Sequence, residues 1–239
     1  PKNKSLFLEN HMYISTNMNA LFAQDAMTVN SRLQTKTMQQ LSTGQRINSA
    51  ADDAAGLSIS DKMTSQINGL NQATQNANDG ISLLQTAEGA LVQQTQMLQR
   101  MRTLALEAST DSTVSGDKSN LDTEYQALLS QLNQIAGNTQ WNATNILDAS
   151  GGLATNGTYV FQVGATQSVT ISVAIKNMST TGALSDIASS VISVAASAQA
   201  AIANIDKAIT AVDSQRTTLG AGINRLTYAA DNLTNIAQQ

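Results

Sequence analysis

The chain has 239 residues, which is enough for one or two domains with a hydrophobic core. Cysteine is absent, which excludes disulfides and thiolate metal sites, and a net charge of −4 excludes a general attraction to nucleic acid or to an anionic membrane. Charged residues make up 13%, and glutamine, asparagine, serine and threonine replace them on the polar faces. These faces are either simply neutral surface or covered by another protein, because uncharged polar groups cost less to bury than charges. The second interpretation would indicate self-assembly.

The amino-terminal region combines a leader and a helix. Residues 1–12 lack periodicity, and His11-Met12 is typical of a cloning junction, so we expect this stretch to be a cloning remnant. An amphipathic helix is predicted over 14–41, because its apolar residues fall roughly on one stripe: Ile14, Met18, Leu21, Phe22, Val29, Leu33 and Met38. Neither a secretory signal peptide nor a run of about 18 apolar residues is present, so no membrane insertion is expected.

The stretch from Leu41 to Ile59, called the connector below, is small, polar and punctuated by Gly44 and Gly56. Asp52 and Asp53 are adjacent, and on a helix adjacent side chains point about 100° apart. They therefore make a poor acid/base pair, and we expect them to form hydrogen bonds at a helix start or within the connector.

A long helix is predicted over 58–108, where apolar residues recur about every 3.5 residues, the coiled-coil period. Residues 111–119 have the composition of a turn, and Ser119 with Asp122 resembles a helix start. A shorter return helix follows as far as Gly137-Asn138, and Trp141 is expected to pack beneath the adjoining loop.

β-branched and aromatic residues predict a β-hairpin at about 158–176, lying against the helices because an isolated hairpin is only marginally stable in water. From Ser185 to Gln239 the three-four apolar spacing predicts a last long helix. Arg216 breaks this spacing; we favour an arginine that reaches the rim over a buried polar residue that sets the register. The predicted fold is mainly α, an elongated antiparallel, coiled-coil-like bundle of long helices with one small β-hairpin.

The residues offer no catalytic, cofactor or metal site. His11 is the only histidine and lies in the suspected leader, and no glycine-rich phosphate loop occurs. Glycosylation sequons begin at Asn142 and Asn156, and without a signal peptide we interpret both as chance matches.

The chain strongly resembles bacterial flagellin. Four blocks carry the resemblance: STGQRINSAADDAAGL at 42–57, NANDGISLLQTAEGAL at 76–91, LQRMRTLA at 98–105 and AIANIDKAITAVDSQRTTLGAGINRL at 201–226; FQVGA at 161–165 adds to them. The resemblance implies a structural subunit that leaves the cell by the flagellar type III export channel and polymerises into the filament used for motility. It implies other flagellin subunits, an export chaperone and the filament cap as partners.

The resemblance also implies a domain organisation. Residues 13–56 would comprise the innermost filament helix and a spoke, and 57–239 a helical inner-filament domain with the hairpin. The spoke residues are Gly44, Arg46, Asn48, Asp52, Asp53 and Gly56. Residues 176–184 pass directly into the last helix, so we expect a core-only flagellin without an outer variable domain. The family's final helix would follow Gln239. Without it we expect 14–41 to lack its partner and this chain to stay monomeric or to form only non-native contacts.

A vertebrate Toll-like receptor senses some flagellins through the helix that carries the third block. Arg100 and Leu104 match its arginine and leucine, whereas Thr103 and Ala127 replace the acidic residues expected nearby. Arg100 could equally face a neighbouring subunit.

Other functions are weighed against the filament subunit. A hook–filament junction protein shares the terminal helices, but the blocks at 42–57 and 76–91 favour flagellin itself. A type III translocator would need a strongly apolar helical hairpin, and an enzymatic flagellin would need an inserted HExxH metalloprotease; the sequence contains neither. A cell-surface adhesin or glycan-binding homologue stays open.

Overall fold

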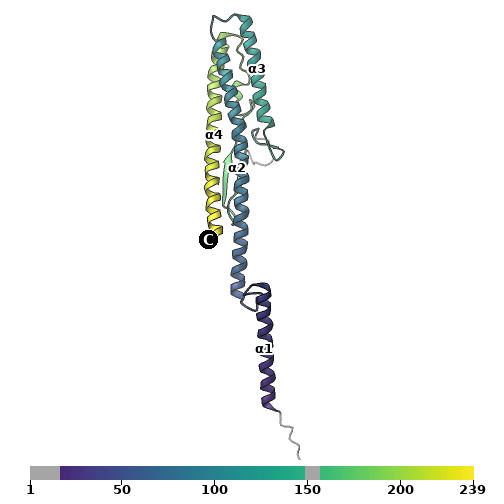
Figure 1. Ribbon diagram of the computed structural model, residues 1–239. Coiled ribbons are helices and arrows are strands. Elements are labelled where there is room, and N and C mark those ends of the chain that lie inside the picture. The colour runs from purple at the N-terminus through teal and green to yellow at the C-terminus, as the bar shows by residue number, and fades with distance from the viewer. Residues whose placement is uncertain (1–16, 149–156) are drawn as a thin grey trace, which may run out of the picture. The chain divides into compact units, whose positions relative to one another are not determined.

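Most of the described chain is helical, as the periodicities predict. The computed structural model describes residues 17–148 and 157–239 (Figure 1). The chain divides into two compact units, Pro1–Met63 and Thr64–Gln239. The suspected leader, residues 1–12, and the sequon at Asn156 lie outside the described residues.

The long helices are α1 (Met18–Thr43), α2 (Ala54–Ala108), α3 (Ser115–Asn138) and α4 (Ala195–Gln238). The side chain of Asn17 caps the start of α1, where Oδ1 accepts from the Ala20 N–H at 3.3 Å. Proline occurs only at position 1, so no proline interrupts the backbone hydrogen bonds of these helices. The predicted helices over 58–108 and 14–41 are confirmed within the described residues.

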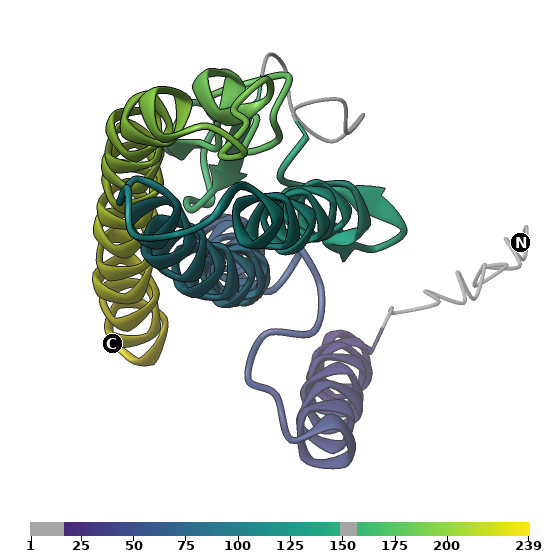
Figure 2. The ribbon, with the colours of Figure 1, turned by 90° about the horizontal axis from the view of Figure 1, so that it is seen from above.

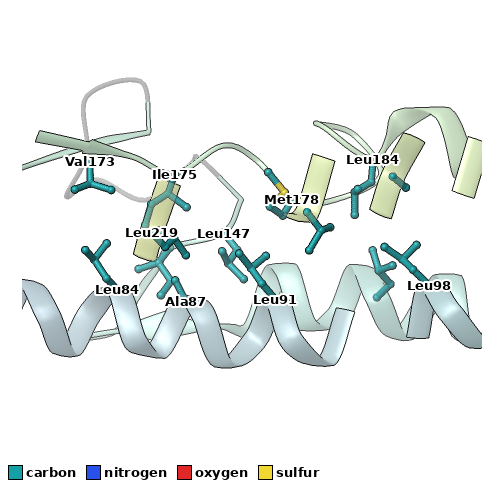
Figure 3. Packing of buried hydrophobic residues seen from close by; sticks show 14 of the residues in the cluster. Leu84, Ala87, Leu91, Leu98, Leu147, Val173, Ile175, Met178, Leu184 and Leu219 are labelled. Carbon is teal, nitrogen blue, oxygen red and sulfur yellow. The ribbon is translucent and has the colours of Figure 1, made fainter. Parts of the chain in front are cut away.

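In the unit Thr64–Gln239, α3 and α4 both run opposite to α2 and flank it (Figures 1 and 2). The heptad positions of α2 form its buried face, which includes Ala73, Ala77, Leu84, Ala87, Leu91, Leu98, Met101, Ala105 and Ala108. Strand β4 (Thr170–Ala174) and the chain after it cover this face: Val173, Ile175, Met178 and Leu184 point toward Leu84, Leu91 and Leu98 (Figure 3). The coiled-coil spacing therefore identifies the face of α2 that packs against both helices and extended chain.

Two antiparallel strand pairs are present among the described residues, where one was predicted. The expected hairpin pairs β3 (Thr158–Gln162) with β4 (Thr170–Ala174), with Phe161 opposite Ile171. The second pair joins β1 (Gln140–Trp141) to β2 (Thr144–Asn145). Its two-residue strands are too short for an alternating pattern. Trp141 belongs to β1 and packs against the core, as expected.

The last helix begins later than predicted. Residues 185–187 form a single 3₁₀ turn, and α4 starts at Ala195 rather than at Ser185. Side chains of α3 hold the intervening backbone: Asp122 Oδ1 accepts from the Ile192 N–H at 2.8 Å, and Gln126 Nε2 donates to the Ser190 carbonyl at 3.0 Å. The irregular backbone thus satisfies its polar groups through tertiary contacts, which local periodicity does not report.

The return helix begins earlier than predicted. The sequence placed the start at Ser119, with Asp122 as its acidic partner. The structure begins α3 at Ser115, with Val114 in extended backbone before it. Asp122 lies inside the helix and binds another segment instead.

Two buried glutamines fix the chain that leaves β4. Gln215 of α4 donates through Nε2 to the Ala174 carbonyl at 2.9 Å and accepts through Oε1 from the Lys176 N–H at 3.3 Å. Gln94 of α2 donates to the Met178 carbonyl at 3.2 Å. These contacts give the buried amides a role in positioning the extended segment against the helices.

The polar residue at the buried register position of α4 is therefore Gln215, one residue before the predicted Arg216. Arg216 lies at the rim, where Nε and Nη2 contact Glu88 Oε1 at 3.0 and 2.9 Å. The interpretation of Arg216 as a residue that reaches the rim agrees with this placement.

Candidate functional site

The connector begins at a left-handed residue. α1 ends at Thr43, and Gly44 follows with φ of 67°. A side chain at Gly44 would meet no atom within 4 Å, so backbone conformation rather than space favours glycine here. Gln40 then closes the turn by donating from Nε2 to the Arg46 carbonyl at 2.7 Å.

Asp52 organises the middle of the connector. Its Oδ2 accepts from the backbone N–H groups of Asn48 and Ser49, both at 3.2 Å, and from the Ser49 hydroxyl at 3.3 Å. Its Oδ1 forms an ion pair with Lys36 Nζ of α1 at 2.7 Å. One carboxylate therefore ties the connector to itself and to the preceding helix. The sequence offered no indication of Lys36 as this partner.

Asp53 has a separate role. Its Oδ1 accepts from the Gly56 N–H at 2.8 Å and so caps the start of α2. A Cβ on Gly56 would overlap the Asp53 carboxylate and lie 3.1 Å from Ile47 Cδ1. The two aspartates thus hold different parts of the backbone, which agrees with the expected hydrogen-bonding role and leaves no shared acid/base arrangement.

Acid is expected to loosen the connector through Asp52. Its pKa is held below the usual 3.8, first by the hydrogen bond from Lys36 and next by the Asn48 N–H. Because the folded pKa is depressed, the carboxylate's contribution to order is complete well above pH 3.8 and is lost as the pH falls below 3.8 through the folded pKa. The amide NMR resonances of Asn48 and Ser49 should therefore move together in this acid range.

The Asp52→Asn variant should show displaced Asn48 and Ser49 resonances already at neutral pH, because a neutral amide replaces the charge that Lys36 pairs with. Asp61→Asn, on α2, is the matched control and should leave them in place. If the Asn48 and Ser49 resonances shifted neither in acid nor in the Asp52→Asn variant, this carboxylate would not order the connector.

The surface of α1 is the second candidate site. None of its described residues is buried. At about 100° per residue, the larger apolar group lies within about 120° around the axis and is called the broad face: Met18, Leu21, Phe22, Val29 and Leu33. A second group within about 60° is called the methionine face: Met27, Met38 and Leu41. The prediction of a single apolar stripe is therefore wrong: the apolar residues form two faces, and Met38 lies opposite Met18.

The ionisable residues of α1 are Asp25, Arg32 and Lys36. At about 100° per residue all three lie within the arc of the broad face, so no charged residue separates the two faces. A helix with apolar side chains on more than one side is usually surrounded by other elements. The exposure of both faces indicates that α1 is a contact element whose partners are not among the described residues of its own unit.

The two receptor candidates differ in accessibility. Arg100 is half exposed and donates through Nε and Nη2 to Glu124 Oε1 of α3, at 2.9 and 2.7 Å. Leu104 is fully buried in the core, so its side chain cannot contact a partner of the folded chain. Of the pair, Arg100 alone offers a side chain at the surface.

The described residues contain no group of three or more histidine, cysteine or carboxylate side chains that could hold a metal. No described helix combines the length and apolar character needed to cross a membrane. A groove of about 540 Å³ is lined by residues of α4 together with Lys176 and Ala183. Asp206 in this lining pairs with Arg102 at 2.7 Å. The residues of the groove form no arrangement of nucleophile and base.

Two models of one protein family match this chain. The bacterial flagellin N-terminal helical region matches residues 14–151, and the bacterial flagellin C-terminal helical region matches residues 202–239.

Individual relatives give the extent of the likeness. A flagellin of Halalkalibacterium halodurans is 40% identical over 227 residues, which is 95% of this chain and 82% of the relative. The B-type flagellin of Pseudomonas aeruginosa is 45% identical over 166 residues, but this chain spans only 33% of its length. The crystal structure of Bacillus cereus flagellin superposes with a TM-score of 0.59 at 27% identity and covers 66% of this chain and 88% of that one.

Proposed function

Because the chain belongs to the bacterial flagellin family, we infer that it is a structural subunit of the extracellular flagellar filament. The family is structural rather than enzymatic, and its filament serves motility. The observation that carries the inference for this chain is α1, a helix of 26 residues with apolar side chains on two faces and no buried residue. Such a helix needs neighbours, and identical subunits provide them.

Burial of these faces favours assembly. Covering a Leu, Val, Phe or Met side chain contributes about 1.5–3 kcal/mol. α1 exposes eight large apolar side chains: Met18, Leu21, Phe22, Met27, Val29, Leu33, Met38 and Leu41. The scarcity of charge lowers the desolvation cost of covering the rest of the surface.

The three parts of the chain would then have distinct places in the filament. Residues 13–56 would supply the innermost helix and the spoke, and 57–239 the next layer with the hairpin. The fixed hydrogen bonds of Asp52 and Asp53 support a connector with one defined shape rather than a flexible linker. A defined shape is what a repeating lattice requires of every copy.

Further partners follow from the family resemblance. An export chaperone would keep the apolar faces of α1 covered before export, and the filament cap would receive the subunit at the growing end. The exposed apolar residues of α1 support both assignments, because each partner must handle a subunit that has not yet been assembled.

A vertebrate Toll-like receptor is proposed to contact Arg100. The exposed ion pair with Glu124 contributes little and leaves Arg100 available to a partner. Because Thr103 and Ala127 replace the acidic residues expected nearby, we expect at most weak recognition. A receptor reporter-cell assay would compare the native chain with Arg100→Ala, and Arg102→Ala of the same helix serves as the control. Equal signals from native and Arg100→Ala chains would remove Arg100 from the receptor contact.

The function itself is tested by polymerisation. The chain is extended after Gln239 with the carboxyl-terminal residues of the Halalkalibacterium halodurans flagellin, so that a segment beyond residue 239 is present in the test. We expect this extended chain to form long, regular filaments by electron microscopy. Dispersed or irregular particles under conditions that polymerise the relative would contradict the proposed function.

A further inference from the structure

The sulfur atoms of this chain are unevenly distributed. The sequence contains eight methionines and no cysteine. Met27 and Met38 of α1 are 75% and 63% exposed, whereas Met101 and Met178 in the core are 0% exposed. Thioethers are therefore the only oxidisable sulfur, and among the described methionines the two most accessible lie on the proposed assembly helix.

The two faces of α1 also differ in chemistry. The broad face is made mainly of Leu21, Phe22, Val29 and Leu33, whose side chains resist mild oxidants. On the methionine face, Met27 and Met38 supply two of the three large exposed apolar side chains, and Leu41 is the third. An oxidant that reacts with sulfur would change this face and leave most of the broad face intact.

We propose that Met27 and Met38 are a modification site at which peroxide controls assembly of the subunit. The thioether sulfur attacks one oxygen of hydrogen peroxide, the O–O bond breaks, and the sulfur becomes a sulfoxide while the peroxide is reduced to water. This proposal rests on the proposed function, because it assumes that α1 is covered in the filament. Oxidation before assembly blocks packing, and assembly protects both sulfurs.

The physical reason is the polarity of the product. A sulfoxide is polar and chiral, whereas the thioether is a flexible apolar group. Burying its oxygen against apolar neighbours without a hydrogen-bond donor is unfavourable, and two such groups lie on one face of the helix. The helix itself persists, because both side chains point away from its backbone and neither is part of the core.

The first measurement follows the chemistry on the free chain of 239 residues. The protein is treated with hydrogen peroxide, and peptide mass spectrometry measures sulfoxide at each methionine over time. We expect Met27 and Met38 to be converted at least about tenfold faster than Met101 and Met178, in keeping with accessibility-controlled oxidation. Similar rates at all four positions in the folded chain would overturn the proposal.

The second measurement follows assembly of the extended chain described above. Peroxide treatment of free subunits should lower filament yield at least about tenfold, while far-UV circular dichroism stays unchanged. In a chain that also carries Met18→Leu, because Met18 is 57% exposed on the broad face, Met27→Leu with Met38→Leu should make assembly resistant, whereas Met18→Leu alone should not. Leucine conserves volume and apolar character. Met63→Leu is the matched control, because Met63 is 59% exposed outside α1, and this variant should stay sensitive.

The outcomes separate this inference from the proposed function. Untreated extended chains that fail to polymerise contradict the function, whereas treated chains that polymerise as well as untreated ones contradict the inference alone. Peroxide applied to finished filaments should leave Met27 and Met38 as thioethers. Sulfoxides at both positions in intact filaments would show that α1 is not covered there and would overturn the protection step.

Discussion

Replacing Phe22, Val29 and Leu33 together by aspartate is expected to abolish filament formation by the extended chain. These side chains lie on the broad face of α1 and are 66%, 51% and 58% exposed. Each substitution removes about 1.5–3 kcal/mol of available apolar burial and adds a charge that must be desolvated. Because every subunit carries the same face, the deficit is repeated at every position of the lattice.

A matched variant separates loss of the apolar face from added charge. Asn19→Asp, Asn30→Asp and Thr37→Asp place three negative charges on the same helix, between the two apolar faces. This variant should still form filaments, and both variants should unfold like the native chain, since none of these residues is buried. Filament loss in both variants alike would assign the effect to charge and contradict a specific role for the broad face.

Leu91→Ala is expected to destabilise the unit Thr64–Gln239 by about 2–5 kcal/mol, the range for removing a large aliphatic side chain from a packed core. Leu91 is fully buried in the core cluster that also contains Leu147, Met178 and Leu219 (Figure 3). The surrounding side chains are close-packed and come from helices and from extended chain, so they can fill the cavity only if these segments shift.

The control for Leu91→Ala is Leu106→Ala on the same helix, where the leucine is 55% exposed. It should change the free energy of unfolding by less than about 0.5 kcal/mol beyond the small propensity difference. Urea titrations followed by circular dichroism would measure the free energy of unfolding of both variants. The slope of this free energy against urea concentration should equal that of the native chain, which checks that the unfolding transition is unchanged. Equal destabilisation by the two substitutions would contradict the assigned core.

The parts of the fold that follow from local periodicity could be predicted from the sequence. The heptad spacing of 58–108 is preserved in the buried face of α2, and the β-branched runs near 160 and 171 form the expected pair of strands. The start of α4 could not be predicted in the same way. Its apolar spacing continues upstream through Val191 and Val194, but tertiary hydrogen bonds from α3 hold that backbone in an irregular form.

The candidate site was predictable in position but not in mechanism. Composition and adjacency indicated that Asp52 and Asp53 make hydrogen bonds. They did not indicate that Asp52 pairs with Lys36 whereas Asp53 accepts from the Gly56 N–H. Lys36 lies in the middle of a helix, and no spacing rule connects it to Asp52. Likewise, Leu104 matched a surface motif by sequence, and only its place in the packed bundle shows that it is buried.

In the proposed filament, neighbouring subunits cover α1. The absence of cysteine allows a direct measurement, because Val29→Cys introduces a single thiol on the broad face. Maleimide labelling should be fast in free subunits of the extended chain and at least about tenfold slower in filaments, as expected when an exposed group becomes buried. Equal labelling rates in free subunits and in filaments would contradict the claim.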